Sequence, residues 1–132
     1  MTIANEDLIS AATEARDNAH CPYSGFSVGA AIVDDQGRLH VGCNVENAAY
    51  PLGSCAEAAA IAAMVQESGK RIVKIAIVGG AGSVGSCTPC GGCRQRIREF
   101  ADEKTVILAI DDSGEWQEYG IGALLPASFH LP

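Results

Sequence analysis

Short runs of hydrophobic residues alternate along the chain with stretches whose apolar positions follow a helical period. Runs of mainly apolar residues predict strands at residues 28–33, 39–43, 72–78 and 105–110, and residues 115–119 are the candidate for a fifth. Helical periodicity or a high alanine content predicts helices at residues 5–21, 55–68, 89–100 and 121–125. Strands and helices alternate in the second half, which favours parallel pairing with helices on both sheet faces. The predicted fold is therefore α/β, a three-layer α/β/α sandwich with a mixed five-stranded sheet.

Polar and conformationally special residues indicate where these elements begin and end. Asn5 is expected to cap the first helix and Pro22 to stop it. The turn at residues 34–37 predicts an antiparallel hairpin between the first two strands. Gly69 stands where a glycine commonly ends a helix. Neither a repeat nor a linker interrupts the pattern, so residues 1–132 are expected to form one domain.

Composition and charge restrict the class of protein. The 132 residues carry a net charge of −7, which disfavours a nucleic-acid partner because an acidic domain repels a polyphosphate chain. The sequence has no apolar run of about eighteen residues, so no membrane span is expected. The N-terminus lacks the basic start and apolar core of a secretory signal. We therefore expect a cytoplasmic protein.

Six cysteines provide the main chemical signal, and in a cytoplasmic domain they favour metal binding or catalysis over disulfides. Cys90 and Cys93 form a Cys-x-x-Cys pair at the start of one predicted helix, and Cys55 starts another. A catalytic zinc site uses three protein ligands and keeps a position for water, whereas a structural site uses four. Cys87 is the rival fourth ligand, but it lies outside the helix that Pro89 begins, and we expect it to be a bystander.

The charge of such a site also favours ligands at helix starts. Three thiolates and one Zn²⁺ sum to about −1, and each helix N-terminus carries roughly +0.5 elementary charge. Beside these ligands, Glu57 has two interpretations. Ser54 and Glu57 match the Ser-x-x-Glu capping box, in which the glutamate only binds a backbone N–H. A zinc-bound hydroxide would instead need such a carboxylate to carry protons, and the nearby cysteine motif favours this second role.

The motifs Cys55-Ala56-Glu57 and Pro89-Cys90-Gly91-Gly92-Cys93 match the signature of zinc-dependent base deaminases. Further blocks at residues 26–30, 44–50 and 124–129 resemble the small cytidine deaminases that act on free nucleosides. The resemblance implies one Zn²⁺ per subunit, held by Cys55, Cys90 and Cys93. It also implies hydrolytic deamination of cytidine and 2′-deoxycytidine in pyrimidine salvage, with Glu57 as the proton shuttle.

The same resemblance implies a nucleoside-binding site shared within a homotetramer. The residues that it places against the substrate are Phe26, Asn44, Glu46, Tyr50, Ala56 and Phe129. Asn44 and Glu46 would bind ribose hydroxyls, while Phe26 would line the base pocket and the backbone N–H of Ala56 would bind the pyrimidine carbonyl. The tail residue Phe129 would pack over the base in a neighbouring subunit. Tyr50 would belong to the same intersubunit shell.

One position departs from the family pattern. Many members with three cysteine ligands carry an arginine directly after the catalytic glutamate, where it relieves the thiolate charge, but Ala58 stands here. We expect the two helix N-termini and Arg94 to compensate this charge instead.

Other functions stay open from the sequence. The glycines of residues 80–85 match the G-x-G-x-x-G of dinucleotide-binding proteins, but they do not open directly into a helix. Cys87, Cys90 and Cys93 could instead hold an iron–sulfur cluster together with Cys55. The domain could also be a zinc-binding module without catalytic activity. A deaminase of another aminopyrimidine nucleoside, such as blasticidin S, would share the zinc motif. An enzyme that edits polynucleotides is disfavoured by the acidic charge.

Overall fold

A computed structural model describes residues 3–132 and has the predicted mixed sheet. The strands are β1 (Phe26–Asp34), β2 (Leu39–Cys43), β3 (Ile72–Ala81), β4 (Val106–Ile110) and β5 (Trp116–Tyr119). The helices are α1 (Asn5–Arg16), the 3₁₀ turn η1 (Tyr50–Leu52), α2 (Ala56–Gln66), α3 (Gly91–Phe100) and α4 (Ile121–Leu124). The sheet order is β2-β1-β3-β4-β5, in which β3 and β4 run parallel and the other neighbours run antiparallel. The predicted hairpin of β1 and β2 is confirmed.

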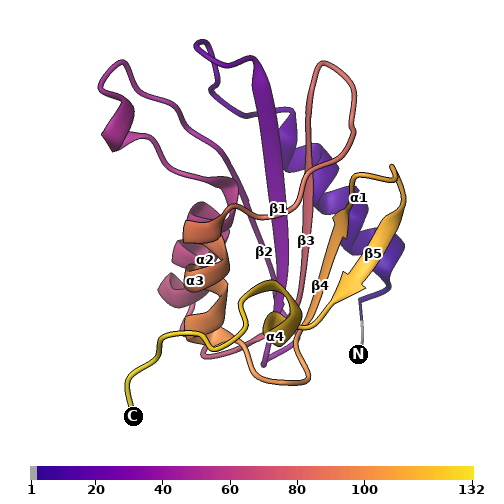
Figure 1. Ribbon diagram of the computed structural model, residues 1–132, viewed down its shortest axis with the longest axis vertical. Helices are drawn as coiled ribbons and strands as arrows, with labels where there is room; N and C mark the ends of the chain where they lie inside the picture. The colour runs from indigo at the N-terminus through magenta and orange to yellow at the C-terminus, as the bar shows by residue number, and fades with distance from the viewer. Residues whose placement is uncertain (1–2) are drawn as a thin grey trace.

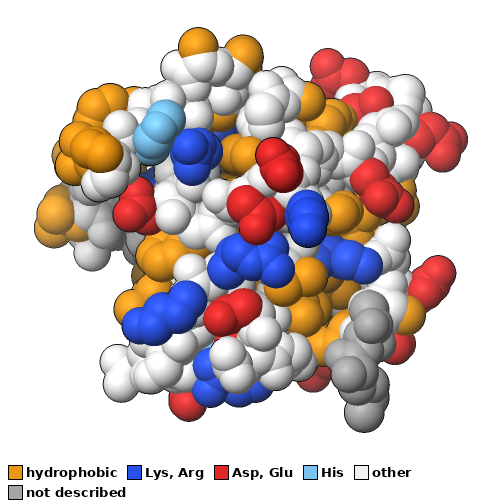
Figure 2. All heavy atoms as spheres, turned by 90° about the horizontal axis from the view of Figure 1, so that it is seen from below, with side chains coloured by type: hydrophobic (Ala, Val, Ile, Leu, Met, Phe, Trp, Pro, Cys, Tyr) orange, Lys and Arg blue, Asp and Glu red, His pale blue; other side chains and the backbone are white. Residues whose placement is uncertain are grey.

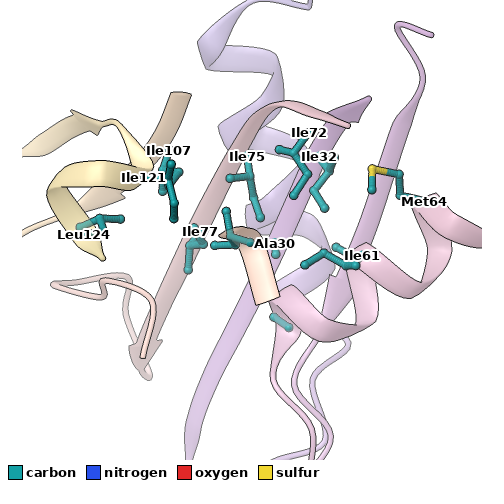
Figure 3. Close-up of a cluster of buried hydrophobic side chains, with 13 residues drawn as sticks. Ala30, Ile32, Ile61, Met64, Ile72, Ile75, Ile77, Ile107, Ile121 and Leu124 are labelled. Carbon is teal, nitrogen blue, oxygen red and sulfur yellow. The ribbon is translucent and has the colours of Figure 1, made fainter. Parts of the chain in front are cut away.

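Helices cover both faces of the sheet, and α2 and α3 lie together on one of them (Figure 1). Side chains alternate along a strand, so Ala30 and Ile32 of β1 face one layer while Ala31 and Val33 face the other. The first pair joins a core with α2, α3 and α4, part of which is drawn in Figure 3. The second pair packs against α1. The predicted three-layer α/β/α arrangement is therefore confirmed.

Two glycines allow helices to lie directly on the strand backbone. A Cβ atom on Gly29 of β1 would be 1.9 Å from the carbonyl oxygen of Ala12 in α1. A Cβ atom on Gly42 of β2 would be 2.4 Å from the backbone nitrogen of Ala60 in α2. Any side chain at either position would push the helix away from the sheet. These close approaches fix α2, which carries Glu57 in its first turn, against β2.

Several predicted element ends are wrong by a few residues. Ala4, not Asn5, is the N-cap of α1, and the Asn5 side chain instead accepts a hydrogen bond from Lys74. This helix ends at Arg16, well before Pro22. Gly69 does not adopt the left-handed conformation after α2, because Ser68 does so with φ of 68°. Within residues 3–132, no helix is both long enough and apolar enough to cross a membrane.

Candidate active site

Three cysteines gather where α2 and α3 begin. Cys55 is the N-cap of α2, Cys90 is the N-cap of α3, and Cys93 lies one turn into α3. Their Sγ atoms all lie within 4.8 Å of one another. Cys93 has no exposed surface, whereas Cys90 is exposed toward the adjoining cleft. The helix starts thus bring together the three ligands that the sequence predicts, although two of them are caps and not residues of the first turn.

The donor set fits a zinc ion. Thiolates are soft ligands that suit Zn²⁺, and three of them leave one position for water or substrate. The N-termini of α2 and α3 both lie at this cluster, where their partial positive charges offset negative charge on the thiolates. Cys87 is not a member of the group of three sulfurs. Burial, together with the nearby Glu57 and Cys90, raises the pKa of the Cys87 thiol to about 11.

The surroundings of the three cysteines disfavour the ionised form of two of them. Desolvation raises the pKa of Cys93, and the neighbouring Glu57 carboxylate raises it further. Desolvation likewise raises the pKa of Cys55. Burial acts on Cys90 in the same direction, but the backbone N–H and thiol of Cys93 and the thiol of Cys55 outweigh it and lower its pKa. Holding all three as thiolates would need a compensating cation, and a divalent metal deprotonates the thiols that coordinate it.

Glu57 is buried beside the cysteine cluster and does not form the predicted capping box. Ser54 cannot complete the predicted capping box, because Cys55 is the N-cap and the Ser54 N–H already donates to the carbonyl oxygen of Val45 at 2.9 Å. The Glu57 residue is only 4 % exposed and faces the same cleft as Cys55 and Cys90. Desolvation raises the pKa of its carboxyl. A buried carboxylate with a raised pKa beside a metal site is typical of a general acid–base catalyst.

A cleft of about 330 Å³ opens above the cysteines, a size that suits a small ligand. Five of the six residues that the resemblance assigns to the substrate line it: Phe26, Asn44, Glu46, Tyr50 and Ala56. They come from the start of β1, the loop after β2 and the start of α2. Figure 1 shows that loop projecting beyond the sheet, with η1 at its tip.

Asn44 and Glu46 organise the wall of this cleft. The Asn44 side chain accepts a hydrogen bond from the Val28 N–H at 2.8 Å and donates one to the Phe26 carbonyl at 2.9 Å. Glu46 accepts hydrogen bonds from the backbone N–H groups of Tyr23 and Ser24 and from the Ser24 hydroxyl. The Ser24 hydroxyl is the main reason why the pKa of Glu46 is lowered. Sequence reasoning missed Ser24, since only the folded loop brings it to Glu46.

Comparisons with known proteins agree with this geometry. Residues 2–109 match the family model described as the cytidine and deoxycytidylate deaminase zinc-binding region. The chain belongs to this family. It is 37 % identical over 124 residues to a cytidine deaminase of Sporosarcina psychrophila, covering 94 % of this chain and 90 % of the relative. It is 43 % identical over 120 residues to one of Mycobacterium tuberculosis, covering 91 % and 85 %.

Solved structures of family members have the same fold. A crystal structure of cytidine deaminase from Burkholderia pseudomallei matches with a TM-score of 0.86 at 37 % identity, covering 96 % of this chain and all of the other. The Mycobacterium tuberculosis enzyme matches with a TM-score of 0.84 at 40 % identity, covering 98 % and 99 %. The expected family and fold are thus confirmed. The dinucleotide alternative fails on geometry as well, because α3 begins only at Gly91, after an irregular segment that follows Gly85.

Phe129 is the one predicted substrate residue that lies apart from the cleft of its own chain. It is 69 % exposed in the C-terminal tail, where its carbonyl oxygen accepts a hydrogen bond from Gln95 of α3 at 3.0 Å. In Figure 1 the tail passes the lower end of α3 and ends far from the loop of residues 44–54.

The structure does not support the expectation for Arg94. Its guanidinium donates to the carbonyl oxygens of Pro89 at 2.7 Å and Leu124 at 3.0 Å, so it supports the backbone around α3. Arg96 instead places Nη1 at 3.6 Å from the Sγ atom of Cys93. Sequence reasoning missed Arg96, although its separation from Cys93 is the i, i+3 spacing at which helix side chains meet.

Proposed function

We propose that this protein catalyses the hydrolytic deamination of cytidine and 2′-deoxycytidine to uridine and 2′-deoxyuridine, releasing ammonia. The observation that carries the proposal is the cluster of Cys55, Cys90 and Cys93 beside the buried Glu57, at the inner end of a nucleoside-sized cleft. Membership of the cytidine and deoxycytidylate deaminase family supports it. So do the matched relatives, which are themselves cytidine deaminases.

The residues of this chain would divide the chemistry as follows. Zinc held by Cys55, Cys90 and Cys93 supplies a Lewis acid that makes water nucleophilic near neutral pH. Glu57 accepts a proton from the attacking water and delivers it to N3 of cytosine, while oxygen adds to C4. Glu57 then carries the second water proton to the departing amino group, so the products are uridine and ammonia. Burial supports this role because a raised pKa lets a carboxyl both accept and release protons.

The cleft offers a surface for each part of a nucleoside. Phe26 would pack on the base and the Ala56 N–H would bind the pyrimidine carbonyl. Asn44 and Glu46 would bind ribose hydroxyls. Each end of an amide can make two hydrogen bonds and a carboxylate can accept about four, so both side chains keep capacity beyond the bonds that hold the loop. The 2′-deoxy substrate should also react, since this pair is proposed to address the other sugar hydroxyls.

The charge of the surface favours a free nucleoside over a polynucleotide. The net charge is −7, and Figure 2 shows a face on which basic side chains are interspersed with acidic ones and with hydrophobic groups. A groove for single-stranded nucleic acid would need a continuous positive track. Blasticidin S remains the alternative substrate within the same chemistry, but the ribose-directed Asn44 and Glu46 favour cytidine.

The direct test follows the loss of cytidine absorbance in the presence of the purified protein. We expect conversion to uridine with release of ammonia, inhibition by a zinc chelator, and recovery when zinc is added back. Blasticidin S and a cytosine-containing oligonucleotide are the comparison substrates and should react far more slowly. A protein that binds zinc but leaves cytidine unchanged would contradict the proposal, and faster turnover of blasticidin S would assign the alternative function.

We also propose that residues 1–132 form a single domain and that the protein acts as a homotetramer in cytoplasmic pyrimidine salvage. Support for assembly comes from large apolar side chains that are exposed in the isolated chain: Val45, Tyr50, Leu52, Phe129 and Leu131. Support for the compartment comes from free cysteines, three of which must stay reduced to hold a metal.

Mixing two inactive variants tests whether Phe129 completes a neighbour's site. Glu57→Gln subunits lack the proposed proton carrier but have an intact tail. Phe129→Ala subunits keep Glu57 but lack the aromatic side chain of the tail. If tails cross between subunits, random co-assembly gives an intact pairing at about one site in four, and activity should reappear. Sedimentation measures the assembly, and cytidine turnover measures the sites. No recovery in mixed tetramers would show that each tail serves its own chain.

A further inference from the structure

The cluster of three thiolates carries more negative charge than its metal removes. Three thiolates and Zn²⁺ sum to about −1, and the N-termini of α2 and α3 offset only part of this because each is partly exposed to solvent at the cleft. Arg96 is exposed and contacts the cluster from the solvent side, with its Nη1 at 3.6 Å from the Sγ atom of the buried Cys93. Glu57 adds a further negative charge beside the same cysteine.

We propose that Arg96 is the positioning residue that compensates the thiolate charge, a role transferred in this chain from α2 to α3. Ala58 of α2 lies three positions after Cys55, the N-cap of that helix, and Arg96 lies three positions after Cys93 within α3. Side chains at this spacing are neighbours on a helix. The chain therefore has two places at this spacing for an arginine after a cysteine of the cluster. Alanine occupies the first, and arginine occupies the second.

The local structure favours Arg96 over the other arginines of α3. Arg94 donates to two backbone carbonyl oxygens, and Arg98 donates to the Ser128 hydroxyl at 2.8 Å. The guanidinium of Arg96 lies back over the first turn of the helix, where a Cβ atom on Gly92 would come within 3.4 Å of Nη1.

A hydrogen bond from a guanidinium draws electron density from the thiolate. The sulfur then donates less charge to the metal, which stays a stronger Lewis acid, while the anionic complex as a whole is stabilised. Removing Arg96 should therefore weaken zinc binding and also change the electronic state of the sulfur. A purely structural arginine would not change the second property.

The test compares Arg96→Gln, Arg96→Lys and the double variant Ala58→Arg/Arg96→Gln with the unchanged protein. Zinc affinity, measured by competition with a chromophoric chelator, should fall about tenfold in Arg96→Gln, the usual scale for an outer-shell partner. Lysine should recover part of this loss. Arginine at position 58 should recover most of it. Arg98→Gln is the matched control, since it removes the same charge from the same helix without touching a ligand, and its zinc affinity should not change.

Cobalt(II) substitution provides a second readout that does not depend on activity. The thiolate-to-cobalt charge-transfer band should move to longer wavelength in Arg96→Gln and return in the double variant. Equal zinc affinity and an unmoved cobalt band in Arg96→Gln would overturn the inference. A weaker affinity that arginine at position 58 does not rescue, with the band unmoved, would also overturn it and leave a structural role.

The inference rests on the proposed function only through its zinc site. If the unchanged protein binds zinc but does not deaminate cytidine, the proposed reaction fails while the affinity series still decides the role of Arg96. If the unchanged protein deaminates cytidine and all the Arg96 variants bind zinc with equal affinity, only the role proposed for Arg96 is contradicted.

Discussion

Glu57→Gln is expected to lower kcat for cytidine by about 10²–10⁴-fold, the usual contribution of a general acid–base group. Glutamine has nearly the same shape as glutamate, so it fills the buried position without a cavity but cannot exchange protons. Glu57 is not one of the three clustered ligands, and zinc content should therefore stay close to one ion per chain. The effect should appear in kcat more than in KM, because proton transfer belongs to the reaction step.

Steady-state kinetics and metal analysis on the same sample separate this expectation from misfolding. Glu67→Gln is a matched control, since it makes the same chemical change at the exposed C-cap of the same helix. Its kinetics should match those of the unchanged protein. Near-normal turnover by Glu57→Gln would remove Glu57 from the proton-transfer role, and loss of zinc from this variant would show that the carboxylate mainly stabilises the metal site.

The hydrophobic pattern predicted β1, β3 and β4 well because each of these strands has a buried apolar core. Residues 72–78 are apolar except for Lys74, and they form most of β3. The ends of elements were harder to predict, since they depend on contacts that form only in the folded chain. Asn5 has the chemistry of a cap, yet it accepts a hydrogen bond from Lys74 of β3. Gly69 does not have the left-handed conformation expected of a glycine that ends a helix. It is favoured by lack of space instead, because a Cβ atom there would be 2.5 Å from the Met64 side chain.

In the candidate site, too, some features could be predicted from the sequence and others depend on contacts that form only in the folded chain. The spacing of Cys55, Cys90 and Cys93 carries enough information to predict the ligand set, because each cysteine stands at the start of a helix. The capping box at Ser54 was also a sound local pattern, but β-bridge pairing with Val45 takes the Ser54 N–H. Which arginine lies beside a cysteine of the cluster depends on how α3 is rotated about its axis. In the sequence, the only indication was that Arg96, unlike Arg94, lies three positions after Cys93.

Removal of one clustered sulfur is expected to abolish both zinc binding and activity. Cys93→Ala leaves two thiolates, and zinc affinity should fall on the order of 10³-fold, beyond the 10–100-fold that an outer-shell partner costs. Cytidine turnover should fall to background at ordinary zinc concentrations, since two ligands hold the ion neither firmly nor in the required geometry. Excess zinc should restore little activity.

Cys87→Ala is the comparison that makes this result specific. Cys87 lies at the same cleft and is half-buried, but it is not one of the three clustered sulfurs. Its removal should leave one zinc ion per chain and most of the cytidine turnover, with a small loss of stability because its side chain packs against the core. Metal analysis, absorption spectra and kinetics on both variants check the difference. An iron–sulfur protein would need Cys87 as its fourth ligand, so a colourless, zinc-loaded and active Cys87→Ala variant excludes that alternative, whereas loss of the metal from this variant would show that the site has four cysteine ligands.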